Sequence, residues 1–135
     1  MKRRTLFLAL ASLAAAALPL GASAQTWPDK PIRFIMSAPA GSSIDVIGRT
    51  IGDKLKDRLG QPVIVENKPA AGGTVAVAEV ARAAPDGYTM VLGFNGPLAT
   101  APMLQKVPYD VQKDLAPVII TSSQPNVLAV NAQLP

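Results

Sequence analysis

Three segments of this chain combine glycine with small polar residues in a way that suits the binding of an anion. They are residues 37–43, 67–74 and 93–97, and apart from Lys68 none of them carries a lysine or an arginine. Each follows an apolar run and precedes a predicted helix, whose first turn offers unpaired N–H groups and a partial positive charge. Small residues would let a carboxylate approach those amides closely. The alternative, that these segments are ordinary short connections, stays open.

The residues that most often carry catalysis are missing. The chain has no His and no Cys, which removes the commonest general base, the commonest metal ligand and thiol chemistry. We therefore expect no catalytic residues, no metal and no cofactor. Residues 41–43 lack the Gly-Lys-Ser/Thr that would complete a phosphate-binding loop. The remaining enzyme hypothesis is a secreted α/β enzyme that acts on a small carboxylated substrate through Asp45 or Glu66.

A parallel sheet covered by helices would position the three segments together. Apolar runs predict strands, and three- to four-residue periodicity predicts helices. The predicted strands are 32–36, 63–65, 88–92, 118–120 and 127–130, and the predicted helices are 44–59, 74–84 and 98–104. This order predicts an α/β fold with a mostly parallel sheet and helices on both faces. In such sheets ligands bind beyond the carboxyl ends of the strands, where the three segments lie.

The helix predicted over residues 44–59 has clear start and stop signals. Its apolar face comprises Ile44, Ile47, Ile51, Leu55 and Leu59. Ser42 and Asp45 stand at the spacing of a capping box, in which each side chain satisfies a backbone N–H. Gly60 suits the left-handed position that ends a helix. Asp45 is therefore interpreted as a cap in preference to a general base.

The first 24 residues have the pattern of a secretory signal peptide. Lys2, Arg3 and Arg4 precede an uncharged apolar stretch at 6–20, and Ala22-Ser23-Ala24 forms a cleavage site before Gln25. The apolar stretch is shorter than the roughly 20 residues of a membrane-spanning helix. We expect cleavage near Ala24/Gln25 and a periplasmic location, with the general and the twin-arginine export routes both left open.

Removal of the signal peptide changes the charge balance of the chain. Three of the 13 basic residues lie in residues 1–24, which leaves ten basic against nine acidic residues. The isoelectric point of about 9.7 therefore belongs largely to the signal peptide. It does not indicate a nucleic-acid partner.

A series of short motifs extends over the whole mature chain. It comprises 27–33 (WPDKPIR), Pro39-Ala40-Gly41 followed by Asp45, 59–69 (LGQPVIVENKP), Ala71-Gly72-Gly73, 80–89 (VARAAPDGYT), 107–110 (VPYD), 113–118 (KDLAPV) and 125–131 (PNVLAVN). In this order the motifs resemble the Bug family, the periplasmic solute receptors associated with tripartite tricarboxylate transporters.

The resemblance implies a periplasmic binding protein of type II, whose two lobes close on a small organic acid without catalysis. It implies delivery of the ligand to a membrane permease or to a sensor, and a monomer when the protein is full-length. Residues 25–124 would then form an incomplete first lobe, and residues 125–135 would begin the hinge crossing to a second lobe that is largely absent.

The resemblance also implies which residues bind the ligand. The family grips a ligand carboxylate through main-chain amides and ordered water in the loop after the first strand, with help from the loop after the third. The matching residues are Pro39, Ala40, Gly41, Ser42, Ser43, Asp45, Asn95, Gly96 and Pro97, and Gly72 and Gly73 lie in the intervening loop. The family more often has Gly at positions 42 and 43. Either the serines are strained there, or their hydroxyls replace a bridging water and alter ligand preference.

Overall fold

The computed structural model describes residues 26–125 and 127–133, and its centre is a three-stranded parallel sheet. The strands are β1 (Ile32–Met36), β2 (Val63–Asn67) and β3 (Thr89–Leu92), in the order β2-β1-β3. Ile32 of β1 lies opposite Val63 of β2, and Arg33 lies opposite Thr89 of β3. β1 is the central strand of a sheet with helices on both faces, and its Ile32, Ile35 and Met36 are fully buried.

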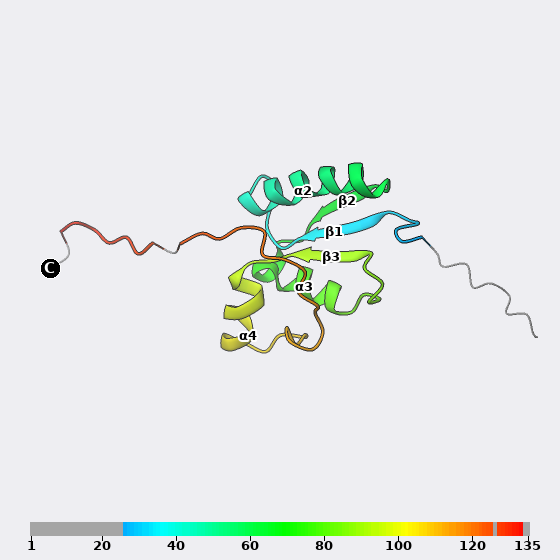
Figure 1. Cartoon of the computed structure of the whole chain (residues 1–135). Helices are drawn as coiled ribbons and strands as arrows, with labels where there is room; N and C mark the ends of the chain where they lie inside the picture. The colour runs from blue at the N-terminus through cyan, green and yellow to red at the C-terminus, as the bar shows by residue number, and fades with distance from the viewer. Residues whose placement is uncertain (1–25, 126, 134–135) are drawn as a thin grey trace, which may run out of the picture.

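Helices cover both faces of this sheet. Figure 1 shows α2 (Ser43–Leu59) on one side of the strands and α3 (Thr74–Ala81) on the other. A short turn, η1 (Ala70–Gly73), precedes α3, and η2 (Gly96–Thr100) runs directly into α4 (Ala101–Leu104). On the α3 side, Val77 and Tyr109 form a small buried cluster that Val91 and Leu98 join. The predicted α/β class, with a parallel sheet between helices, is confirmed.

Helix α2 approaches the sheet through glycines. Gly48 and Gly52, one turn apart, are buried, whereas the predicted apolar face from Ile44 to Leu59 is only partly buried. A Cβ added at Gly48 would lie 2.1 Å from the Sδ of Met36. The periodicity therefore predicted the helix and its end at Gly60, where φ is 68°, but it missed the residues of closest approach.

The second predicted helix is shorter than expected. It ends at Ala81 instead of Ala84, and Ala84 is exposed where the periodicity placed it inside. After Ala81 the N–H groups of Arg82 and Ala83 bond to carbonyls only three residues back. Pro85 contributes to the early end, because it has no N–H to donate to the Ala81 carbonyl and it disfavours the helical conformation at Ala84.

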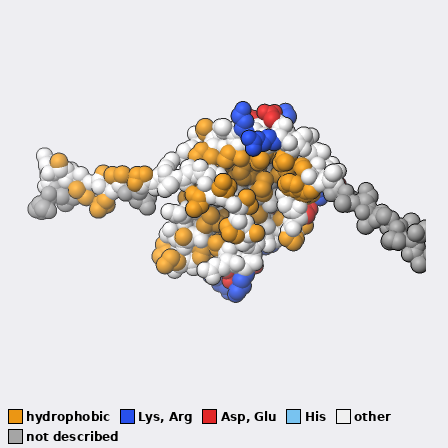
Figure 2. Space-filling model, viewed as in Figure 1, with side chains coloured by type: hydrophobic (Ala, Val, Ile, Leu, Met, Phe, Trp, Pro, Cys, Tyr) orange, Lys and Arg blue, Asp and Glu red, His pale blue; other side chains and the backbone are white. Residues whose placement is uncertain are grey.

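The two strands predicted over residues 118–120 and 127–130 are wrong. The described part of this segment is extended but joins no sheet, and it leads away from the domain (Figure 1). Its apolar side chains are exposed, for example Ile120 at 86% and Leu128 at 92%, and Figure 2 shows them along the extension. β-branched composition gives a segment only a propensity, and a strand forms when a neighbour pairs with it.

The predicted signal peptide, residues 1–24, lies outside the described residues. Within the described ranges, no helix combines the length and the apolar character that crossing a membrane requires.

The close approach of α2 predicts unequal effects for two matched substitutions. Gly48→Ala should lower the free energy of unfolding by about 1–3 kcal/mol, because its methyl group would overlap fully buried Met36. Gly52→Ala meets its nearest atom, on Val63, at 3.3 Å, and it gains up to about 1 kcal/mol of helix propensity. Denaturant unfolding of both variants checks this order, and equal losses would contradict it.

Candidate functional site

The three glycine-rich connections meet beyond the carboxyl ends of the strands. Gly73 lies between the other two, since a Cβ on it would be 2.5 Å from the carbonyl oxygen of Ser37 and 3.2 Å from the ring of Pro97. Its φ of 89° also lies in the left-handed region, and only glycine meets both demands without strain. The structure therefore brings segments 37–43, 67–74 and 93–97 into contact at one edge of the sheet.

Three hydrogen bonds that the sequence did not predict, two from Ser37 and one from Tyr109, hold this edge together. Ser37 is buried, and its N–H and hydroxyl both donate to the carbonyl of Leu92, at 3.2 and 2.9 Å. The hydroxyl of Tyr109, also buried, donates to the carbonyl of Pro97 at 2.6 Å. A buried tyrosine hydroxyl needs such a partner, but the sequence around Tyr109 gave no signal that it would be buried.

The loop between β1 and α2 accommodates serine at position 42 without strain. Ser42 has φ −73° and ψ 164°, so the strained interpretation is wrong, and Gly41 with φ 80° makes the left-handed turn. The Ser42 hydroxyl accepts from the N–H of Asp45 at 3.3 Å and donates to the carbonyl of Pro39 at 2.7 Å. The predicted cap therefore forms, and the hydroxyl of Ser42 both donates and accepts within the loop.

The reciprocal half of the capping box differs from the prediction. The Ser42 N–H donates to the carbonyl of Pro39, and the Asp45 carboxylate instead accepts from the N–H of Gly41 at 2.9 Å. The turn at Gly41 points that N–H back at the first turn of α2, so the carboxylate closes the loop one residue earlier than expected.

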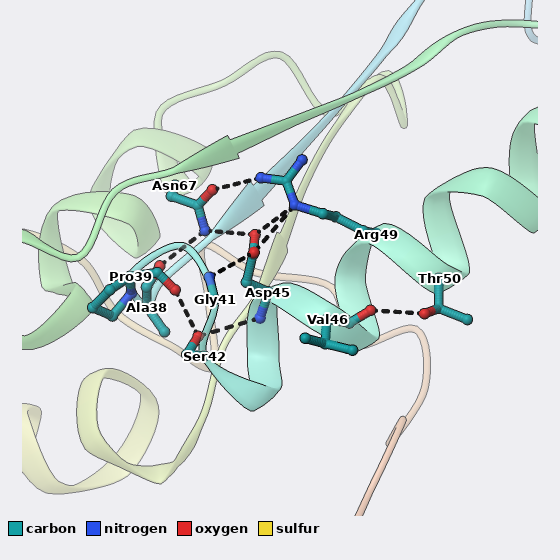
Figure 3. A network of polar contacts seen from close by, with 9 residues as sticks. All are labelled: Ala38, Pro39, Gly41, Ser42, Asp45, Val46, Arg49, Thr50 and Asn67. Carbon is teal, nitrogen blue, oxygen red and sulfur yellow. Dashed lines mark hydrogen bonds and ion pairs between the residues drawn. The ribbon is translucent and has the colours of Figure 1, made fainter.

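Asp45 is the centre of a network of polar contacts that Figure 3 shows from close by. Its side chain is only 6% exposed and lies 3.0 Å from the Nε of Arg49. Asn67, the last residue of β2, donates from Nδ2 to Asp45 at 2.9 Å and accepts from Arg49 at 3.0 Å. Arg49 above all, then the N–H of Gly41 and the Asn67 amide, lower the pKa of Asp45 to about 2.

The first two N–H groups of α2 are not used in this way. Within the described residues, no group accepts a hydrogen bond from the N–H of Ser43 or of Ile44. Both groups lie at the positive end of a 17-residue helix. Ser43 itself is exposed, so an acceptor can reach this end of the helix from solvent.

The residues predicted to bind the ligand divide into two groups by their accessibility. The accessible group, exposed or partly exposed, comprises Pro39, Ala40, Gly41, Ser42, Ser43, Gly72, Asn95 and Gly96. Asp45, Gly73 and Pro97 are buried. The three buried residues pack beneath the loops, and the accessible surface is formed by the other eight.

Glu66, the second candidate base of the enzyme hypothesis, belongs to a cluster of charges on the α3 side of the sheet. Arg33 donates to both oxygens of Glu66, at 2.7 and 2.9 Å, and to Glu79 at 2.7 Å. Lys68 forms ion pairs with both glutamates. Arg33 is the main cause that lowers the pKa of Glu66 to about 2. Lys68, the one cation of the three segments, is thus committed to carboxylates of its own chain.

The described residues contain no group of three or more acidic side chains that could hold a metal ion.

Comparisons with known proteins place the chain among transport receptors. Residues 47–135 match the family described as tripartite tricarboxylate transporter family receptor. The chain is 47% identical, over 96% of its length, to a UPF0065 protein of Bordetella bronchiseptica. It is 40% identical, over 90% of its length, to protein BugT of Bordetella pertussis. It spans 38% of the length of each relative.

Two solved structures with bound acids share the fold. MatC from Rhodopseudomonas palustris with bound malate has a TM-score of 0.61 and 35% identity, over 65% of this chain and 30% of that one. The R. palustris protein Rpa4515 with adipate has a TM-score of 0.60 and 27% identity, over 64% of this chain and 29% of that one.

The contact at Gly73 predicts different losses of stability for a further matched pair of substitutions. Gly72→Ala and Gly73→Ala both place a side chain at positive φ, at 65° and 89°, which costs about 1–2 kcal/mol. Gly73→Ala also drives a methyl group against the Ser37 carbonyl, whereas Gly72 has open space. We expect Gly73→Ala to lose clearly more stability in thermal unfolding than Gly72→Ala, and similar losses would contradict the close contact.

The ion pairs of Asp45 and Glu66 with arginines predict that the stability of the fold is sensitive to acid. The pKa values of Asp45 and Glu66, about 2 in the folded chain, lie below the ordinary values near 4. Their stabilisation is therefore full above about pH 5 and is lost as the pH falls toward 2. We expect the melting temperature to fall over this range, and to fall less steeply in Glu66→Gln than in Asp57→Asn, which changes an exposed carboxylate. A flat profile in the unmodified chain would contradict the ion pairs.

Proposed function

The chain belongs to the family of tripartite tricarboxylate transporter receptors, and on that premise we propose that it is a periplasmic solute-binding protein. It captures a small organic acid at the loops beyond the carboxyl ends of β1, β2 and β3, and it acts by binding and not by catalysis. The acids bound to MatC and to Rpa4515, malate and adipate, support a carboxylate as the ligand of this chain.

The observation that carries the proposal is the accessible start of α2. The N–H groups of Ser43 and Ile44 point out of the helix without a partner in the described residues. A carboxylate has two oxygens that can accept from adjacent N–H groups, and hydrogen bonds to an ionised acceptor are the stronger ones. The small residues Ala40 and Gly41 beside them leave room for a close approach.

The neighbouring loops supply the rest of the surface. Gly72 is exposed on the connection before α3, and Asn95 is exposed before η2. The amide of Asn95 can donate to a hydroxyl or to a second carboxylate, groups that distinguish one small acid from another. We assign the choice of ligand to this loop and the common carboxylate to the start of α2.

The state of the acidic residues supports binding over the enzyme hypothesis. Asp45 and Glu66 are both ion-paired, and a carboxylate with a pKa near 2 is a weak base at neutral pH. With no His and no Cys in the sequence, the chain also lacks the commonest general base and a thiol nucleophile.

The proposal extends to the organisation of the protein. Residues 1–24 form a signal peptide that is cleaved near Ala24/Gln25, residues 25–124 form a first lobe, and residues 125–135 begin the crossing to a second. The exposed apolar side chains of residues 118–130 support a further lobe, because such a surface favours burial. The full-length receptor is a monomer that passes its ligand to a membrane permease or a sensor.

A direct test is ligand binding by the full chain. We expect malate or adipate to raise the melting temperature in a concentration-dependent way, because a ligand that binds only the folded state stabilises it. Isothermal titration gives the affinity. A panel of small carboxylates that leaves the melting temperature unchanged, together with formation of a product, would overturn the proposal.

One substitution removes a single N–H from the proposed site. Ser43→Pro deletes the N–H at the first position of α2, where proline is well tolerated, and Ser42 already has the extended conformation that a following proline requires. We expect a loss of carboxylate affinity of about tenfold or more, since a hydrogen bond to a charged group contributes about 1.5–3 kcal/mol.

Ser43→Ala is the matched control, since it removes the hydroxyl and keeps the N–H. It should bind malate or adipate within about twofold of the unmodified chain, a change of only about 0.4 kcal/mol. Equal affinity in the Pro and Ala variants would show that the ligand does not use this amide.

A further inference from the structure

We propose that Arg49 is a charge-compensating residue of the carboxylate site, which neutralises Asp45 so that an anionic ligand can reach the start of α2, while Asn67 sets the shape of the loop. This inference rests on the proposed function and assigns roles to Arg49 and Asn67, neither of which is among the residues that the family resemblance implies for ligand binding.

The need for compensation follows from the place of Asp45. Its carboxylate lies in the first turn of α2, bonded to the N–H of Gly41 and two residues from Ser43. A ligand carboxylate at the start of the helix would therefore face a fixed negative charge at short range. The Asp45 side chain is nearly excluded from solvent, so water screens this repulsion poorly.

Arg49 meets the need by its position one turn along the helix. The i,i+4 spacing places its guanidinium beside the carboxylate, with Nε 3.0 Å from one oxygen of Asp45 and 3.1 Å from the other. Half of the Arg49 side chain is exposed. The pair as a whole carries no net charge, which leaves the amides and the helix dipole as the electropositive feature that the ligand meets.

Asn67 has a different role in the same network, which is to connect the loop after β1 to the end of β2. Its Nδ2 donates to the carbonyl of Ala38 at 3.1 Å as well as to Asp45, and its Oδ1 accepts from Arg49. Because Asn67 ends β2, the amide joins the loop after β1 to the start of the next connection (Figure 3). Its loss should change the geometry of residues 38–41 and leave the charge balance untouched.

Titrations of the full chain with malate and adipate separate charge compensation from direct contact. We expect Arg49→Ala to weaken binding roughly tenfold, and the double variant Asp45→Asn/Arg49→Ala to recover most of that loss, because it removes the repelling charge as well. Arg49→Lys, which keeps the positive charge, should retain most of the affinity. If Arg49→Ala does not stay folded, Arg49→Gln, which keeps the length of the side chain, carries the same comparison.

The matched control is Arg58→Ala, which removes the same charge from the exposed last turn of the same helix. Nine residues along α2 correspond to roughly 13 Å, beyond the screening length at physiological salt, so its affinity should change less than about twofold. Equal losses in Arg49→Ala and Arg58→Ala would overturn the proposal. A double variant as weak as Arg49→Ala would also overturn it, because Arg49 would then be touching the ligand itself.

A measurement without ligand tests the loop and keeps the two proposals distinguishable. Amide hydrogen exchange at Gly41 should quicken about tenfold in Asn67→Ala, and an unchanged rate would contradict the role of Asn67. An unmodified chain that binds no carboxylate contradicts the proposed function instead.

Discussion

The carboxyl ends of three adjacent parallel strands share one edge of the sheet. The three connections that leave these ends must therefore pack closely against one another. The contact of Gly73 with the carbonyl of Ser37 and the ring of Pro97 makes this packing possible, because a backbone without a side chain can lie between the other two loops. The start of α2, the turn before α3 and the start of η2 depend on that contact for their relative positions. A candidate site exists at this edge because the three segments fit there together.

The motif Glu66-Asn67-Lys68 shows how one strand end serves both faces of the sheet. Successive side chains of a strand point to opposite faces, so Glu66 joins Arg33 and Glu79 on the α3 side, while Asn67 joins the network of Asp45 on the α2 side. In these pairings, the charged side chains around this edge of the sheet bind partners from the same chain. The amides at the start of α2 then remain without a partner among the described residues.

Other motifs of the sequence acquire a structural meaning. The segment WPDK and the segment PDGY, far apart in the sequence, meet at the amino ends of β1 and β3. There the Tyr88 hydroxyl bonds to Asp29, Lys30 lies 3.2 Å from Asp86, and Trp27 packs near Tyr88. The VPYD motif supplies Tyr109, which holds the carbonyl of Pro97. These contacts stabilise the frame at both ends of the sheet, and they give these motifs a structural role.

The sequence by itself determined the class of fold, the first three strands, the long helix with its cap at Ser42 and its end at Gly60, and the three loops, because these follow from local periodicity and from backbone rules. It could not determine contacts between distant segments. The approach of Gly48 to Met36, the pairing of Asn67 with Asp45, and the failure of residues 118–120 to pair as a strand depend on which surfaces come together. Only the tertiary structure decides that, since packing and strand pairing are properties of neighbours in space and not of neighbours along the chain.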